Sequence, residues 1–412
     1  MDKKVLVIIV AAVIVIGGVA AFVIINNNNG GSDKVSSMNI VGRVNSEGSG
    51  ILLKPGEIAS DYITVQDAQP GLGAKYIYNE STGKYYVFNV ANWGGKVFAT
   101  PGAATIQHVQ LSELAGTMGL KYASYTDGMT PSSDTLYYVA GVASFADFVN
   151  KIKTSPLVGF ICWEAQYSVG LESNYIGLAL TNDLFDGHTC CIIGTTNVYL
   201  KNSSNTLMVF LNTYAAAVSK IKAAIANPTS ADYTQLVNIA KNRVSMPDGM
   251  TDEQKEHAIK SALENVTYLF ADDAAGSLTA LEADIAKLAE SLYNGHQIQN
   301  SASDLGFSSY TALAEKFVDD QYMKKAIAGD YTKLDSTTKI TVAAINGDIH
   351  QIALWFAKDT GMFDDAKLNV DVSGQSGGPG VYTVLANGEA DIGFLGAPPM
   401  TIRCMNAEMI HA

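Results

Sequence analysis

Hydrophobic positions along most of the chain switch between two spacings, one typical of strands and one typical of helices. Short runs rich in β-branched residues predict strands at residues 39–44, 96–99, 157–163, 190–195 and 339–344. Between residues 206 and 226 apolar side chains recur every three or four positions, which predicts a helix that Asn227 and Pro228 should end. Thr251 followed by Gln254 is a capping-box pattern, and residues 252–330 are expected to be mostly helical. The alternation of strands and helices predicts α/β architecture.

The first 37 residues have a different character from the rest. Residues 5–25 form an uncharged apolar run that is long enough to cross a hydrocarbon core of roughly 30 Å, at about 1.5 Å per helical residue. Lys3 and Lys4 precede the run, so the positive-inside bias places the bulk of the chain on the extracytoplasmic side of the cell membrane. Residues 1–25 are expected to be a single-pass membrane anchor, with a cleaved signal peptide as the alternative. Residues 26–37, rich in Asn, Gly and Ser, are expected to be a polar tether.

Composition narrows the class of protein and of partner. A chain of 412 residues, 48% hydrophobic and 16% charged, is typical of an ordered globular protein with two or three lobes. The formal net charge of −13 argues against nucleic acid, because phosphate binding needs clustered Lys and Arg and the sequence has no basic run beyond Lys3 and Lys4.

The four cysteines do not predict a metal site or a disulfide framework. Cys162, Cys190, Cys191 and Cys404 lack paired C-x-x-C spacing, and buried thiols are expected. His188, Cys190 and Cys191 form a local cluster with metal-ligand chemistry, but adjacent residues of a strand point to opposite faces, so a buried strand is expected there instead. No metal, no cofactor and no catalytic residue is predicted, and the sequence has no Ser-His-Asp order that would indicate an enzyme.

The segment from Ile340 to Met400 carries a specific combination of motifs. G-D-x-H stands at residues 347–350, A-K-x-x-G-x-F at 357–363, L-A-x-G-E-x-D-I-G at 385–393 and G-A-P-P at 396–399. Together they resemble the opening of the nitrate, taurine and alkanesulfonate class of ABC-transporter solute-binding proteins. The segments that normally follow this opening resemble residues 40–57, 94–111, 162–166 and 184–200, near the front of this chain.

The order of the motifs is therefore rotated, with the family's beginning at this chain's end. A circular permutant in which residues 335–339 join the former termini is the simplest account, because chain ends in compact domains often lie close together. A truncated tandem array or a broken reading frame is the alternative, in which the last segment would complete a neighbouring domain or another chain.

The resemblance implies a periplasmic-binding-protein-like (type II) α/β fold with two lobes and a ligand cleft between them, preceded here by the transmembrane helix. Lobe I would combine residues 38–54 and 189–412, with the family's N-terminal segment at 340–412. Lobe II would be residues 55–188, and the chain would cross between the lobes near Glu47, with glycines serving as hinge positions.

The resemblance also implies a set of ligand-binding residues at strand ends and helix starts, where unpaired backbone N–H groups favour an anion or a carbonyl oxygen. The end of the chain contributes Gly347, Asp348, His350, Ser376, Gly377, Gly378, Gly396 and Ala397. The front contributes Glu47, Ser49, Gly102, Ala104, Thr105, Gln107, Trp163 and Glu164. The helix start at Thr105 is the first choice; the structural alternatives are an Asp helix cap, plain glycine turns and a packing Trp. Residues 376–380 are expected to form a turn before a helix that begins at Val381, and residues 396–398 a loop after a buried strand.

The predicted function is the solute-binding component of an ABC importer, with permease subunits as partners and hinge closure of two lobes around a small molecule. No Arg or Lys lies in the candidate motifs, so an anion such as a sulfonate, nitrate or bicarbonate would depend on helix N-termini and hydroxyls. A thiamine-pyrimidine-like heterocycle is the alternative ligand, and a membrane-anchored ligand sensor is the alternative function. An enzyme on the same scaffold is not expected.

Overall fold

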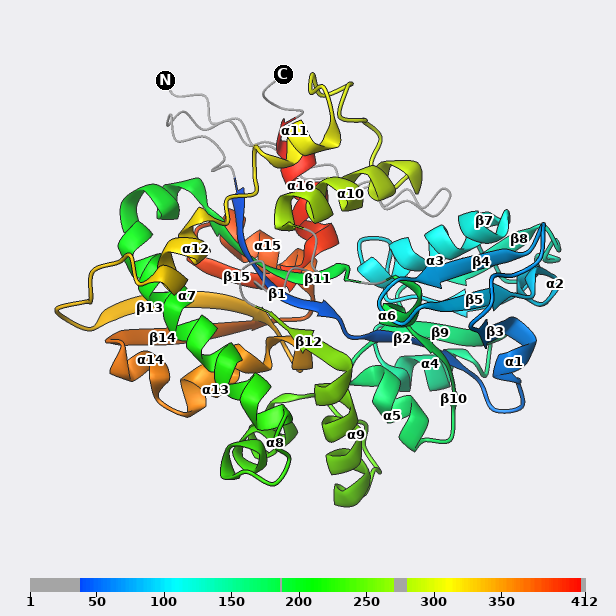
Figure 1. Cartoon of the computed structure of the whole chain (residues 1–412), viewed down its shortest axis with the longest axis horizontal. Helices are drawn as coiled ribbons and strands as arrows, with labels where there is room; N and C mark the ends of the chain where they lie inside the picture. The colour runs from blue at the N-terminus through cyan, green and yellow to red at the C-terminus, as the bar shows by residue number, and fades with distance from the viewer. Residues whose placement is uncertain (1–37, 186, 270–279, 409–412) are drawn as a thin grey trace, which may run out of the picture. The chain divides into compact units, whose positions relative to one another are not determined.

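The computed structural model describes residues 38–185, 187–269 and 280–408, which form a mixed α/β protein with three sheets (Figure 1). The predicted membrane anchor and tether lie outside these residues. In the described part of the chain, no helix is both long and apolar enough to cross a membrane.

Sheet A has six strands in the order β12-β1-β11-β15-β13-β14. Its strands are β1 (Met38–Glu47), β11 (Thr189–Thr196), β12 (Val266–Tyr268), β13 (Thr338–Ile345), β14 (Leu368–Gln375) and β15 (Ile392–Gly396). Strand β13 runs parallel to both β14 and β15, whereas β11 is antiparallel to its neighbours β15 and β1. Segments from the front and the end of the chain thus share one sheet.

Sheet B also has six strands, in the order β10-β2-β9-β6-β8-β7, and sheet C has three, in the order β3-β5-β4. The strands of sheet B are β2 (Ser49–Leu53), β6 (Val97–Ala99), β7 (Lys121–Ser124), β8 (Thr135–Val139), β9 (Leu157–Trp163) and β10 (Ile176–Leu180). The strands of sheet C are β3 (Ile63–Gln66), β4 (Lys75–Asn79) and β5 (Lys84–Phe88). Strand β2 is antiparallel to both of its neighbours.

Five strands of each sheet follow the same plan. The order β14-β13-β15-β11-β1 in sheet A matches β8-β6-β9-β2-β10 in sheet B, and the fourth strand is reversed in both. Each reversed strand is reached from the other sheet. Strand β2 follows β1 across Gly48, and β11 follows β10 through α6 (Thr181–Leu184). The two sheets are therefore joined by two crossings, which Figure 1 shows near the centre of the molecule.

Helices cover both sheets. Those before β11 are α1 (Ala59–Tyr62), α2 (Val90–Trp93), α3 (Ile106–Met118), α4 (Phe145–Lys151), α5 (Gln166–Glu172) and α6. Those after β11 are α7 (Asn197–Ile225), α8 (Ala231–Arg243), α9 (Asp252–Asn265), α10 (Leu281–Asn294), α11 (Tyr310–Ala314), α12 (Gln321–Ala328), α13 (Ile352–Asp359), α14 (Met362–Asp365), α15 (Gly378–Ala386) and α16 (Ala397–Glu408), with a short 3-10 helix at Ile349–Gln351. Helix α7 packs against α8, α12 and α13, and α10 packs against α11 and α16.

Three apolar clusters form the core. One surrounds sheet A and continues into α7 and α13, and the other two lie on sheet B. Ile106 and Val109 of α3 belong to the cluster of sheet A, and Ala258 of α9 belongs to a cluster of sheet B. Helices α3 and α9 therefore add apolar contacts between the parts built around the two sheets, in addition to the crossings.

Most of the predicted elements are confirmed, since strands β1, β6, β9, β11 and β13 lie where the pattern indicated. Helix α9 begins at Asp252 with the predicted capping box between Thr251 and Gln254. Helix α7 ends at Ile225 as expected but begins at Asn197, well before the predicted start, with a non-helical residue at Ser203. Within the described residues of the interval 252–330 there are four helices but also strand β12, which forms the edge of sheet A.

Two local predictions are wrong. Helix α15 begins at Gly378 and not at Val381, because Pro379 is tolerated in the first turn, where no N–H group needs an intrahelical partner. Residues 396–398 were expected to form a loop, but Gly396 ends β15 and Ala397 already begins α16, with Pro398 and Pro399 in its first turn.

Candidate functional site

The crossing at Glu47, Gly48 and Ser49 is the centre of the candidate site. Glu47 and Gly48 both have positive φ, at 65° and 83°, which turns the chain from sheet A into sheet B. The main-chain N–H of Glu47 and the hydroxyl of Ser46 donate to the carbonyl of His188, at 3.1 and 2.9 Å. These bonds tie the first crossing to the second.

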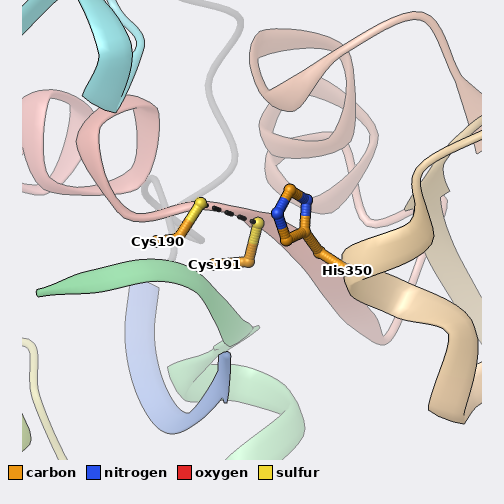
Figure 2. Close-up of side chains that lie close together, drawn as sticks. All are labelled: Cys190, Cys191 and His350. Atoms are coloured by element: carbon orange, nitrogen blue, oxygen red, sulfur yellow. Dashed lines mark hydrogen bonds between the residues drawn. The ribbon is translucent and has the colours of Figure 1, made fainter. Parts of the chain in front are cut away.

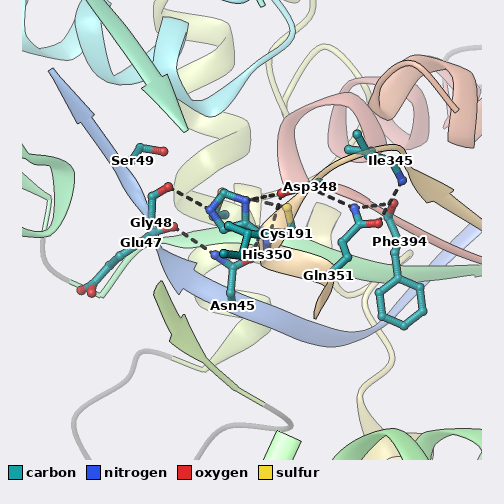
Figure 3. A network of polar contacts seen from close by, with 12 residues as sticks. Asn45, Glu47, Gly48, Ser49, Cys191, Ile345, Asp348, His350, Gln351 and Phe394 are labelled. Atoms are coloured by element: carbon teal, nitrogen blue, oxygen red, sulfur yellow. Dashed lines mark hydrogen bonds and ion pairs between the residues drawn. The ribbon is translucent and has the colours of Figure 1, made fainter. Parts of the chain in front are cut away.

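Asp348 and His350 approach the crossing from the end of β13 (Figure 3). Asp348 caps the short 3-10 helix by accepting from the main-chain N–H of His350 at 3.0 Å. Its carboxylate lies 2.7 Å from Nδ1 of the His350 ring, and Nε2 of the same ring lies 2.8 Å from the carbonyl of Gly48. His350 thus bridges a carboxylate of sheet A and the crossing strand.

Gln351 holds this arrangement in place. Its amide donates to Asp348 at 3.2 Å and to the carbonyl of Phe394 at 3.1 Å, and its side-chain oxygen accepts from the N–H of Ile345 at 2.9 Å. Gln351 therefore links β13, β15 and the helix start, and leaves little freedom for Asp348 (Figure 3).

Both ring nitrogens of His350 face acceptors, so the ring donates from both and carries a positive charge. Burial works against that charge. The carboxylate of Asp348, the sulfur of Cys190 and the hydrogen bonds to Asp348 and Gly48 outweigh burial and raise the pKa of His350 to about 10. The site therefore holds a buried cation next to the crossing.

Glu164 approaches Gly48 from sheet B. Its main-chain N–H donates to the carbonyl of Gly48 at 2.8 Å, so this carbonyl receives a hydrogen bond from each sheet. The Glu164 carboxylate accepts from the N–H and hydroxyl of Ser168, at 3.1 and 3.0 Å, and from the amide of Asn265 at 2.7 Å. Burial raises the pKa of Glu164, and these hydrogen bonds oppose the rise.

The start of α3 meets the crossing through Ser49. Thr105 caps the helix, and the buried amide of Gln107 donates to the hydroxyl of Ser49 at 2.8 Å. One turn later, the amide of Gln110 lies 2.9 Å from Nε2 of His188, on the second crossing. Helix α3 therefore presents two amide side chains to the two crossings.

His108, on the same helix, lies instead among the aromatic rings of sheet B. Its ring packs against Tyr122 and Tyr138, and Nδ1 lies 3.2 Å from the hydroxyl of Thr100. Burial lowers the pKa of His108 to about 4, so the folded protein holds the ring neutral.

This burial predicts an acid-sensitive fold. The unfolded chain protonates His108 near its ordinary pKa of about 6.5, so stability is fully present above that pH and is lost as pH falls toward 4. Between pH 7 and 4, the wild-type chain should lose about 2 kcal/mol more unfolding free energy than His108→Gln. Urea unfolding of both chains at each pH measures the difference; equal losses would show that His108 does not titrate on unfolding.

Of the remaining candidate residues, Trp163 and Gly347 adjoin this network, and the others belong to the turns and helix starts around it. Gly378, in the first turn of α15, packs against Pro399 and the N–H of Gly396, which joins the starts of α15 and α16. Gly347 packs against Ser245, and Ser376 is exposed. Gly377 directly precedes α15, and Ala397 is the first residue of α16. Gly102 and Ala104 lie in the turn before α3. Trp163 is half-buried and pairs with Ser49.

The two adjacent cysteines do not point to opposite faces, which corrects the sequence argument. Cys191 pairs with Asn45 and Thr189 pairs with Ser46, so the pairing skips Cys190 and β11 carries a bulge there. A bulge breaks the alternation of side chains, and the two sulfurs lie 4.0 Å apart. The ring beside them belongs to His350 (Figure 2). His188 contacts Phe185 and Gln110 instead.

Residues that sequence reasoning missed lie in the helical interval after α8. Asp284 of α10 accepts from the N–H of Thr189 at 2.8 Å and lies 3.4 Å from the fully buried guanidinium of Arg43. Asn265 contacts Glu164, and Tyr268 donates to the carbonyl of Ile349 at 3.1 Å. Arg43 is a charged residue within the buried strand β1, which was a signal that it has a buried partner. The sequence did not indicate which residue that partner is.

Comparisons with known proteins give two similar solved structures. One, from Bordetella bronchiseptica RB50, is 12% identical, covers 72% of this chain and 76% of its own, and has a TM-score of 0.43. The other is the periplasmic aliphatic sulphonate binding protein SsuA from Escherichia coli, which is 14% identical, covers 64% of this chain and 66% of its own, and has a TM-score of 0.39. No family model and no curated protein matches the chain.

Proposed function

We propose that the chain is the extracytoplasmic solute-binding component of an ABC importer, which encloses a small molecule between two lobes and performs no chemistry on it. The observation that carries the proposal is the repeated strand order of sheets A and B, with each reversed strand supplied by a crossing from the other sheet. Two sheets joined by two short crossings can close on a solute by a small rotation at the crossings. Among the segments that resemble the solute-binding class, residues 347–350, 40–57 and 162–166 meet at the first crossing, through the bonds of His350 and Glu164 to the Gly48 carbonyl.

The proposed solute is a small anion such as a sulfonate, nitrate or bicarbonate. Helix α3 begins beside the crossing, and its first turn offers unpaired main-chain N–H groups together with the amide of Gln107. The carboxylate of Glu164 is occupied by Ser168 and Asn265, so it does not repel an anion as strongly as a free carboxylate would.

Calorimetry with the purified chain tests the class of solute. Taurine, nitrate and bicarbonate are titrated separately, with a thiamine-type aminopyrimidine as the alternative ligand. Saturable binding of one of the anions supports the proposal. If only the pyrimidine binds, the proposed solute changes from an anion to a heterocycle. If none of these compounds binds, the proposed class of solute is wrong.

Gln107→Ala should weaken solute binding about fivefold to tenfold, because a hydrogen bond of this kind contributes about 1 kcal/mol. Gln321→Ala, at the exposed start of α12, is the matched control and should bind with unchanged affinity. The same calorimetry measures both variants, after circular dichroism shows that each is folded. An unchanged affinity for Gln107→Ala would remove the start of α3 from the site.

We also propose that the rotated motif order describes one permuted copy of the fold, with lobes divided at the crossings near residues 48 and 188. Strand β2 then belongs to lobe II, and not to lobe I as the sequence prediction of residues 38–54 had it. Strands β13, β14 and β15 come from the end of the chain and join β11 and β1 in a single sheet, which supports one copy over a truncated array. Native mass spectrometry should find a monomer that binds one solute. A domain-exchanged dimer would contradict the simple permutant.

The membrane anchor remains a proposal drawn from the apolar run of residues 5–25. It would hold the binding protein at the cell surface beside its permease, whereas a ligand sensor would have no permease to serve. Amino-terminal sequencing of the protein isolated from membranes decides between anchor and signal peptide, because cleavage would remove the run.

A further inference from the structure

Cys190, Cys191 and His350 bring three metal-binding atoms together at the crossing of the two sheets (Figure 2). One sulfur or ring nitrogen from each residue lies within 4.8 Å of the other two. The residues are 3%, 4% and 1% exposed, so their arrangement is set by the packing around them. The two buried thiols of this cluster have no role in the solute site proposed above.

The spacing fits a four-coordinate cation. With metal–sulfur bonds of about 2.3 Å, two thiolates of a tetrahedral site lie roughly 3.8 Å apart. The sulfurs of Cys190 and Cys191 are 4.0 Å apart because the bulge in β11 turns both side chains the same way. A small movement of the His350 ring toward the sulfurs would complete three protein ligands.

Asp348 already orients the third ligand. Its carboxylate lies 2.7 Å from Nδ1 of His350 and is itself held by Gln351. A carboxylate on one ring nitrogen fixes the tautomer and the ring plane, so that the other nitrogen faces a metal. That nitrogen, Nε2, now lies 2.8 Å from the carbonyl of Gly48, and a metal would take the place of this bond.

A second observation comes from Tyr214 on α7. Its side chain is fully buried, burial and then the charge of Cys191 raise its pKa, and its hydroxyl has no hydrogen-bond partner among the described residues. An unpaired buried hydroxyl is costly, and a group bound at the cysteines would offer it a partner.

We propose that Cys190, Cys191 and His350 bind a thiophilic divalent cation such as Zn²⁺. Two thiolates and an imidazole are a ligand set that favours zinc over magnesium or calcium. Binding displaces one proton from each protonated thiol and one from the ring nitrogen. This leaves two thiolates and a neutral imidazole as the metal ligands. Three protein ligands leave the fourth position to water or to another small group.

Zinc binding to the reduced full-length chain is the first test. After removal of metals with a chelator, the wild-type chain should take up one Zn²⁺ per molecule, as counted by native mass spectrometry. Cys190→Ser and Cys191→Ser keep the shape of the side chain but should weaken binding at least tenfold. Cys404→Ser, which alters another buried cysteine, is the control and should bind like the wild type.

A spectroscopic test needs no variant and so does not depend on how a variant folds. Co²⁺ added to the reduced wild-type chain should give thiolate-to-cobalt absorption that saturates at one equivalent and is removed by Zn²⁺. Absence of this absorption, or Zn²⁺ uptake that Cys190→Ser and Cys191→Ser retain in full, would overturn the metal site. Either result leaves the solute titrations unaffected, so the two proposals fail separately.

Discussion

Replacing Asp284 with Asn is expected to lower the free energy of unfolding by about 3 kcal/mol, since it removes a carboxylate that pairs with the buried charge of Arg43. The Arg43 side chain is fully buried and that of Asp284 is 12% exposed, with 3.4 Å between Nη2 and Oδ2. Asp284 also accepts from the N–H and the hydroxyl of Thr189, at the end of the second crossing. Its loss therefore weakens sheet A where the chain returns from sheet B.

Urea unfolding followed by tryptophan fluorescence measures this loss, and the chain provides a control. Asp359 pairs with Arg243 through bonds of 2.6 and 3.0 Å, but the two side chains are 26% and 37% exposed. Asp359→Asn should therefore cost no more than about 1 kcal/mol. The double variant Arg43→Met with Asp284→Asn should be more stable than Asp284→Asn alone, because the buried charge that lost the Asp284 carboxylate is gone. Equal losses at positions 284 and 359 would contradict the account.

The elements that could be predicted from the sequence are those whose signal is local. Strands β9, β11 and β13 are runs of apolar, β-branched residues, and a capping box at Thr251 marks the start of α9. The early part of α7 could not be predicted in this way, because residues 201–205 are all polar and the helix is interrupted at Ser203. The apolar period becomes clear only from Leu207 onward.

The candidate site was predictable in part, because the family resemblance selected residues that the fold brings to Gly48. His350 and Glu164 both bond to the Gly48 carbonyl, and Gln107 bonds to the neighbouring Ser49. Ser376 does not join them. Its selection rested on a turn pattern, which describes local backbone and carries no information about distant contacts.

The cysteine cluster could not be predicted, because it depends on two features that no periodicity encodes. The register between β1 and β11 places a bulge at Cys190, and the pairing of β11 with β15 brings in a chain segment from the far end of the sequence. A strand without a bulge would place the two thiols on opposite faces, as the sequence argument assumed. The Cys-Cys doublet and the Asp-x-His motif were the available signals, but nothing in the sequence joins them.

Gly48→Ala is expected to have the largest effect of any single substitution proposed, about 2 to 5 kcal/mol in unfolding free energy. Gly48 has a φ of +83°, which is unfavourable for a residue with a side chain. An added Cβ would also lie 2.4 Å from Nε2 of His350 and 2.9 Å from a methyl group of Val266. The substitution therefore combines backbone strain with the loss of the bond between His350 and the crossing.

Gly56→Ala separates these two causes. Gly56 has a φ of +95°, but an added Cβ there would meet no atom within 4 Å, so only the backbone cost of about 1 to 2 kcal/mol remains. Urea unfolding of both variants should show the greater loss for Gly48→Ala, and solute calorimetry should show weakened binding for that variant alone. If both variants lose the same unfolding free energy, the packing of His350 against the crossing does not contribute to stability. If Gly48→Ala binds solute normally, the crossing does not act as the hinge.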